Sequence, residues 1–322
     1  MEPVGAARTV APSQLAAAAE TCGRVAANIR RAVEVRDGVL HSLLVALLAE
    51  GHILIEDYPG VGKTALARAL ARSLDCQFAR VQCTTDLLPA DVVGTNVYNQ
   101  REQRFEFRPG PIFANVVLVD ELNRASPKTQ SGLLECMQER HVTVDVHTHE
   151  LARPFVVLAT QNPIELEGTY PLPEAQVDRF LCRLVLGYPS ASGEAEMLAA
   201  HESGDRVREL EPVVRRDDVL AAQDAAAGVF VAQPLRQYIV AVLDHTRQDR
   251  RVELGASPRA GLMLLRAAKA RALLAGRDHS LPDDVQALAE TVLAHRIVLA
   301  PEADSGARAA VLADALAAVP AL

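Results

Sequence analysis

The sequence predicts an α/β domain with a mostly parallel β-sheet and helices on both faces, followed by a smaller all-helical domain. In the first part of the chain, short apolar runs alternate with helical patterns, and most of these runs lack the polar alternation of a half-exposed strand. From about Ser190 onward, strand patterns largely stop and helical patterns follow one another. We therefore expect a first domain over residues 1–189, with a loose start of about 12 residues, and a second over 190–322.

The expected strands of the sheet are five apolar runs. They are Ile53–Glu56, Phe78–Gln82, Val116–Val119, Phe155–Ala159 and Cys182–Leu186. Helices are expected between them. One should follow Thr64, where leucine and alanine recur, and another should run from Pro127 to Glu139.

Two segments interrupt this alternation and read as short hairpins. The first, Thr95 to Pro111, has apolar pairs on either side of a polar turn; the second, Arg140 to Leu151, alternates valines with polar residues. Both could equally be decoration of the surface.

The second domain should contain helices near 192–203, 217–227, 234–247, 258–275, 282–294 and 305–318. Pro234, Pro258 and Pro282 lie where first turns begin, and Gly276 lies where one helix closes.

Composition and charge argue against a nucleic-acid-binding, a membrane-spanning or a secreted protein. Lys plus Arg number 33 against 41 Asp plus Glu, so the net charge is −8, which argues against a protein built mainly to grip nucleic acid. The most apolar stretch, Val39–Ile55, contains charged and polar residues and is too polar to span a bilayer. The N-terminus lacks a signal-peptide layout, and the five cysteines form no C-x-x-C pair. These features predict a soluble, cytoplasmic protein with reduced thiols and no membrane insertion.

The stretch "DYPGVGKT" after the first strand is a variant of a phosphate-binding loop. The usual pattern is G-x-x-x-x-G-K-[ST], and here Asp57 replaces its first glycine. Gly60 and Gly62 remain where the backbone must bend close to a ligand. Lys63 would reach the β- and γ-phosphates, and Thr64 would hold Mg²⁺. A chance match to a Gly- and Lys-containing turn is the alternative.

A second motif supports the nucleotide interpretation. "ANVVLVDELNRA" is an apolar strand that ends in Asp120 and Glu121, and we expect it beside the strand that leads into the phosphate loop. Asp120 could bind Mg²⁺, and Glu121 could polarise a water for attack on the γ-phosphate. The alternative is a solvated acidic strand end.

Three further residues are candidates for the same chemistry. Asn162 follows the fourth strand and could orient the attacking water, or it could merely cap the strand. Arg179 could supply charge to a transition state as an arginine finger, or it could pair locally with Asp178. Arg259 lies in the first turn of a helix, where a cation opposes the helix dipole, so an external phosphate could be its partner; a solvated surface arginine is the alternative.

Together these motifs resemble the MoxR-like family of AAA+ ATPases, from about residue 20 to 320. The most specific stretches are "HILIEDYPGVGKT", "FEFRPGPIFANVVLVDELNRASPKTQSGLLECMQER", "LATQNPIELEGTYPLPEAQVDRF" and "GASPRA". Loops of this family often lack the first glycine of the Walker A motif, so Asp57 fits it. One departure is that Val35 and Arg36 stand where the family usually has a Gly-Gln pair near the adenine.

The resemblance implies a P-loop NTPase fold, ATP and Mg²⁺ as ligands, and a role for each candidate. It gives Pro59, Gly60, Val61, Gly62, Lys63 and Thr64 to the Walker A loop, Asp120 and Glu121 to Walker B, Asn162 to sensor 1, Arg179 to the arginine finger and Arg259 to sensor 2. It also makes the two hairpins the helix-2 and pre-sensor-1 inserts, which face the central pore in related rings.

For the whole protein the resemblance implies an ATP-hydrolysing, chaperone-like motor that remodels or matures a protein client. It implies a homo-oligomeric ring, expected to be a hexamer, and a partner with a von Willebrand factor A domain. A nucleotide-gated scaffold with little turnover and a DNA-directed motor are the alternatives. The acidic net charge argues against the second.

Overall fold

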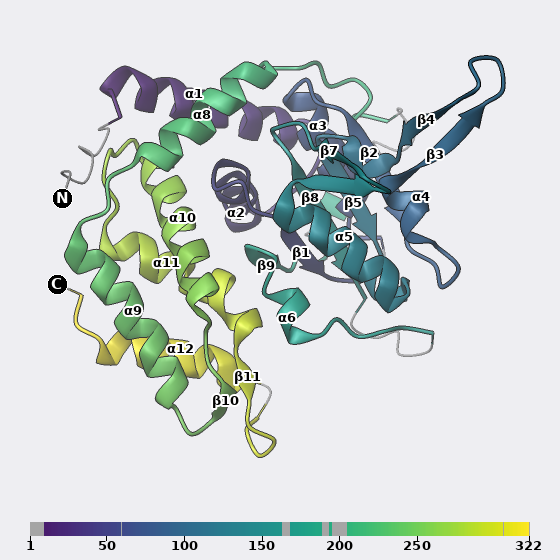
Figure 1. Cartoon of the computed structure of the whole chain (residues 1–322). Helices are drawn as coiled ribbons and strands as arrows, with labels where there is room; N and C mark the ends of the chain where they lie inside the picture. The colour runs from purple at the N-terminus through teal and green to yellow at the C-terminus, as the bar shows by residue number, and fades with distance from the viewer. Residues whose placement is uncertain are drawn as a thin grey trace, which may run out of the picture.

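The computed structural model describes residues 10–58, 60–162, 168–188, 193–194, 205–304 and 306–321. Within these ranges the first part of the chain forms a five-stranded sheet in the order β2-β5-β8-β1-β9, and every pair of neighbours is parallel (Figure 1). The strands are β1 (Ile53–Glu56), β2 (Phe78–Gln82), β5 (Val116–Asp120), β8 (Val156–Gln161) and β9 (Cys182–Leu184). All five predicted strands are thus present, with shifts of one or two residues at some ends.

Alternate residues of β1, β5 and β8 enter two separate apolar cores, one on each face of the sheet. On β1, Ile53 and Ile55 belong to one core while Leu54 belongs to the other. The helices α1 (Pro12–Arg30), α2 (Asp37–Leu48) and α3 (Lys63–Ser73) cover the first face, and α5 (Pro127–Glu139) covers the second. This is the predicted arrangement of helices on both faces. The long helix α1 was not expected from the sequence.

The strand order corrects one expectation. The strand that ends in Asp120 does not lie beside β1, because β8 is inserted between them. Sheet neighbours are set by the pairing of strands far apart in the chain, which local patterns do not report. The consequence for the site is that the end of β8 lies between the two motifs.

The second part of the chain is a bundle of helices. Its described helices are α8 (Arg216–Gly228), α9 (Gln233–Gln248), α10 (Pro258–Leu274), α11 (Pro282–Leu293) and α12 (Ala307–Ala318), each within two residues of its predicted bounds. The helix expected near 192–203 falls almost wholly outside the described residues. Two short antiparallel strands, β10 (Val252–Leu254) and β11 (Val298–Leu299), add a small sheet to this otherwise helical region.

The two parts share a core. Helix α1 packs along α8, and α2 packs against both α8 and α10, so one apolar cluster runs from the sheet through α1 and α2 into the bundle (Figure 1). The N-terminal helices are therefore the bridge that fixes the bundle against the sheet.

Both hairpins form as predicted. Strands β3 (Gly94–Asn99) and β4 (Arg104–Pro109) pair in one, and β6 (His141–Val144) and β7 (His147–Glu150) in the other. Figure 1 shows the tip of the first hairpin projecting from the sheet domain. Tyr98 and Phe105 lie in contact on this hairpin and are exposed.

The remaining described elements are short: α4 (Pro89–Val93), α6 (Glu174–Val177) and the 3₁₀ turns Pro111–Phe113, Leu122–Arg124 and Ala294–Arg296. No helix among the described residues is both long enough and apolar enough to cross a bilayer.

Candidate nucleotide site

The loop between β1 and α3 has the backbone of a phosphate cradle. Gly60 and Gly62 adopt φ angles of 86° and 87°, which L side chains rarely adopt. Helix α3 begins at Lys63, directly after Gly62, so its unpaired N–H groups and positive dipole end face the loop. Pro59 lies outside the described residues. The local sequence thus places a candidate anion site at the carboxyl edge of the sheet.

The cavity beside this loop gathers most of the predicted residues. It has a volume of about 280 Å³ and is lined by Gly60, Gly62, Lys63, Thr64, Ala65, Arg80, Asp120, Glu121, Thr160 and Asn162. Thr64 and Asp120 both line this space, and their oxygens are ligands suited to Mg²⁺, because this ion is held by one or two carboxylates together with substrate phosphates. Among the described residues, no group of three or more His, Cys, Asp or Glu side chains could hold a metal ion by itself.

Lys63 is held inside this cavity. Its Nζ donates a hydrogen bond to the backbone oxygen of Asp57 at 2.7 Å. Burial lowers the pKa of Lys63, while the carboxylates of Asp120, Asp57 and Glu121 raise it. The ammonium group is thus partly desolvated and has carboxylates nearby. A bound phosphate would compete with these carboxylates and with the Asp57 oxygen for the ammonium group.

Thr160 at the end of β8 connects the two acidic residues. Its Oγ1 donates to Asp120 Oδ1 at 2.6 Å and accepts the backbone N–H of Glu121 at 2.9 Å. Glu121 has a left-handed backbone, with φ 57° and ψ 48°, so the chain turns sharply between the two carboxylates. Its side chain accepts from Arg124 at 3.1 Å. This geometry gives the two carboxylates different surroundings, as different roles require.

Arg80 on β2 is a site residue that the sequence analysis missed. It donates to Asp120 Oδ2 at 2.6 Å, because β2 and β5 are neighbours in the sheet. The guanidinium thereby balances the carboxylate that would hold the metal. Thr160 was missed as well, although it lies two residues before Asn162. The available signals were a polar residue near a strand end for Thr160 and a charged residue in the middle of a predicted strand for Arg80, but only the strand order makes them neighbours of Asp120.

Asp57, which replaces the first glycine of the loop motif, is a structural anchor. It is 3% exposed, and its carboxylate accepts the backbone N–H groups of Tyr58 at 2.9 Å and Gly187 at 2.7 Å. The second bond ties the loop to the segment that follows β9. A glycine here would lose both bonds.

Restoring the consensus glycine should therefore destabilise the protein. We expect Asp57→Gly to lower the free energy of unfolding by about 1–3 kcal/mol, because two backbone N–H groups lose a buried, charged acceptor. Asp57→Asn is the matched control and should lose less, since one acceptor oxygen remains. Denaturant unfolding followed by circular dichroism measures both; a glycine variant as stable as the parent would contradict the anchor role.

A second cavity, of about 360 Å³, adjoins the loop. It is lined by Val33, Glu34, Val35, Arg36, Val61, Gly62, Leu66, Leu186, Gly187 and Tyr188. The segment expected near the adenine is therefore beside the phosphate loop. The guanidinium of Arg36 donates to the backbone oxygen of Val185 at 2.6 Å, so this side chain fastens α2 to the end of β9.

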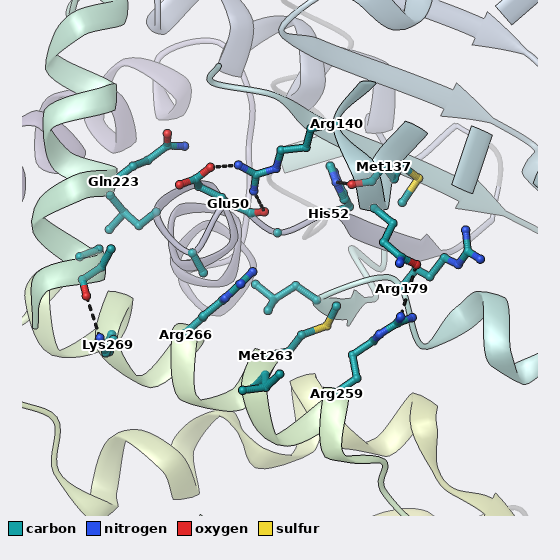
Figure 2. A pocket seen from close by; sticks show the side chains of 18 residues that line it. Glu50, His52, Met137, Arg140, Arg179, Gln223, Arg259, Met263, Arg266 and Lys269 are labelled. Carbon is teal, nitrogen blue, oxygen red and sulfur yellow. Dashed lines mark hydrogen bonds and ion pairs between the residues drawn. The ribbon is translucent and has the colours of Figure 1, made fainter. Parts of the chain in front are cut away.

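Arg179 and Arg259 are not in either of these cavities. Both line a third cavity of about 540 Å³, bounded by the ends of α2 and α5 and by α8 and α10 (Figure 2). Arg179 precedes β9, and β9 pairs in parallel with β1 through Cys182 and Ile53 at its start. Lys63 follows the other end of β1, so Arg179 and Lys63 of one chain lie at opposite edges of the sheet.

The contacts of these two arginines also bear on their alternatives. Asp178 forms its ion pair with Arg296 at 2.8 Å, and among the described contacts none joins it to Arg179. The buried Nε of Arg179 has no hydrogen-bond partner. Arg259 is half-buried and donates to Gln138 of α5 at 3.3 Å. The local ion pair with Asp178 is therefore wrong as an explanation of Arg179.

Comparison with known proteins identifies the family of the chain. The family described as "ATPase family associated with various cellular activities (AAA)" matches residues 52–182, and "AAA lid domain" matches residues 244–315. The chain is 50% identical to the uncharacterized protein YeaC of Bacillus subtilis, over 87% of this chain and 88% of the relative. It is 42% identical to Chaperone MoxR1 of Mycobacterium tuberculosis, over 90% of this chain and 78% of the relative.

A crystal structure of a protein from Cytophaga hutchinsonii has the same fold. It superposes with a TM-score of 0.88 at 37% identity, covering 96% of this chain and 97% of that one. Sequence, site geometry and relatives agree from the phosphate loop to the helical lid, and the chain belongs to the MoxR-like family of AAA+ ATPases.

Proposed function

We propose that this protein binds Mg²⁺·ATP beside Lys63 and hydrolyses it to ADP and phosphate, with the core over residues 1–189 and the lid over 190–322. The observation that carries the proposal is that a single cavity collects Lys63, Thr64, Asp120, Glu121 and Asn162 next to a helix N-terminus. Each of these types has a use in phosphoryl transfer, which depends on positioning and on stabilising charge.

In this proposal different residues of the cavity bind the phosphates, hold the metal ion and activate the water. The N–H groups of the loop and Lys63 bind the phosphates, and Thr64 and Asp120 hold Mg²⁺, which neutralises charge on the transferring phosphoryl group. Glu121 accepts a proton from water while the oxygen of that water bonds to the γ-phosphorus. The bond from the γ-phosphorus to the β–γ bridging oxygen breaks. Asn162 orients that water. ADP leaves with the bridging oxygen, and inorganic phosphate carries the oxygen of the water.

We also propose that the protein works as a cytoplasmic ring, a hexamer, that uses hydrolysis to remodel or mature a protein client. The support is that Arg179 and Arg259 lie away from the phosphate loop of their own chain. In a ring with repeated head-to-tail contacts, these arginines would instead face the phosphate loop of the neighbouring subunit. The name of the relative Chaperone MoxR1 supports the chaperone role. A partner with a von Willebrand factor A domain is proposed from the family resemblance alone.

Phosphate release from Mg²⁺·ATP by the purified full chain tests the enzyme directly. Multiple turnovers that stop when Mg²⁺ is chelated are the expected result. Binding of ATP without turnover would overturn the proposal in favour of the nucleotide-gated scaffold.

Duplex DNA should neither bind nor stimulate this ATPase at physiological salt. The chain has 33 Lys and Arg against 41 Asp and Glu, so its acidic side chains oppose the neutralisation of DNA phosphates and the release of counterions. Fluorescence anisotropy with a labelled duplex, repeated at several salt concentrations, measures binding, and phosphate release with and without the duplex measures stimulation. A tight complex that weakens steeply with salt would instead identify a DNA-directed motor.

A further inference from the structure

Asp178, the residue before Arg179, joins the core to two parts of the lid. Its Oδ1 accepts from Arg296 Nε at 2.8 Å. Its two carboxylate oxygens also lie 3.3 and 3.2 Å from the hydroxyl of Ser257, which can donate to either. Ser257 caps helix α10 by accepting the N–H of Ala260, and Arg259 lies in the first turn of that helix. One carboxylate therefore contacts the segments that carry both arginines of the large cavity.

Arg296 of the lid forms hydrogen bonds with the segment 178–181, which contains Arg179. Its side chain is 1% exposed and donates to the backbone oxygens of Asp178 at 3.2 Å and Leu181 at 3.2 Å, and also to that of Phe180. It thus holds the backbone on both sides of Arg179. Its Nη2 also contacts Met263 Sδ of α10 at 2.6 Å. Burial lowers the pKa of Arg296 and Asp178 raises it, and an arginine keeps its charge in such a setting.

These contacts have a geometric consequence. Arg179 belongs to the segment leading into β9, and Arg259 belongs to the lid, yet both line one cavity (Figure 2). A buried guanidinium with a planar fork of donors fixes direction as well as distance. The two arginines are consequently set in place by the same pair of charges, although 80 residues separate them in sequence (259 − 179).

We propose that Asp178 and Arg296 are a positioning pair that holds Arg179 and Arg259 as one rigid unit facing the neighbouring subunit's nucleotide. The inference rests on the proposed action of Arg179 across a ring interface. Because Arg296 and Ser257 belong to the lid, the lid of one subunit then sets the position of both arginines that act on the next. Neither member of the pair touches the reacting atoms.

The test uses the full chain with Asp178→Asn, which keeps a hydrogen-bond acceptor for Arg296. We expect kcat to fall about 10- to 100-fold, as for a small misplacement of a catalytic group, while ATP affinity stays within about twofold of the parent. Mixed with Lys63→Ala subunits, Asp178→Asn should regain activity, because its intact phosphate loop then receives a correctly held arginine from a neighbour. A defect in its own fold would not be rescued this way.

Asp284→Asn is the matched control. Asp284 is a buried lid carboxylate paired with Arg277 and with Arg271, which lies in the last turn of α10, at the opposite end of that helix from Arg259. It should lower the melting temperature without lowering kcat. If Asp178→Asn behaves like this control, or if mixing fails to rescue it while Arg179→Ala is rescued, the positioning role is overturned and the ring proposal stands. If Arg179→Ala is not rescued either, the ring proposal itself has failed.

A second pair of variants changes Ser257 and leaves the charges of Asp178 and Arg296 in place. Ser257→Ala removes the link from Asp178 to α10 together with the cap on the N–H of Ala260, and we expect kcat to fall several-fold because Arg259 is then less firmly positioned. Ser257→Asn can cap the helix and donate to Asp178, so it should retain the parent's kcat. Equal kcat for the alanine variant and the parent would contradict the proposal.

Discussion

Glu121→Gln should bind ATP as the parent does and lose most of its turnover, whereas Lys63→Ala should lose binding itself. Glutamine keeps the volume of Glu121 but cannot accept the proton of water, and such a group contributes about 10²–10⁴-fold to rate. Lys63 lines the cavity directly after Gly62 and is half-buried near the carboxylates of Asp120, Asp57 and Glu121. Its removal takes away a cation that ATP needs in the ground state.

Titration with a fluorescent ATP analogue measures affinity, and phosphate release under saturating ATP measures turnover. Glu135→Gln, an exposed carboxylate on α5 away from the cavity, is the matched control and should behave as the parent. An equal loss of ATP affinity in the Lys63 and Glu121 variants would refute the division of roles between them.

Two inactive variants should restore each other when their subunits mix. Arg179→Ala retains the phosphate loop, and Lys63→Ala retains the arginine. An arginine supplied by a neighbour can be worth about 10³–10⁵-fold in rate, so Arg179→Ala alone should bind ATP and hardly turn it over. In randomly mixed closed rings about one interface in four pairs an intact loop with an intact arginine. ATPase activity should then return, unless several intact neighbours are needed in sequence.

Native mass spectrometry must first establish that mixed rings form. The double variant Lys63→Ala/Arg179→Ala, mixed with Arg179→Ala, is the control and should stay inactive because no interface holds an intact arginine. Should the mixture of the two single variants remain at the sum of its parents, Arg179 does not act across an interface. Since Asp178 is already paired with Arg296, a packing role beside that pair would then be the better account.

Much of the core was readable from local patterns. Strands buried on both faces have continuous apolar runs in the sequence. Both bounds of β1 were predicted correctly, because Gly51 lies shortly before its apolar run and Asp57 directly after it. The loop residues were readable for the same reason, since Gly60 and Gly62 are needed where φ is positive. The helices of the lid were marked by proline in their first turns and by their apolar period.

The sequence by itself thus determined which short segment has the pattern of a phosphate-binding loop and which carries paired acidic groups, because those patterns depend on neighbours in the chain. Only the tertiary structure decided which strand ends meet. It put β8 between the two motifs, brought Thr160 and Arg80 to Asp120, and set Arg179 at the far edge from Lys63. It also paired Asp178 with Arg296, 118 residues away. Strand order and buried ion pairs arise from packing between distant segments, whose free energy no local pattern records.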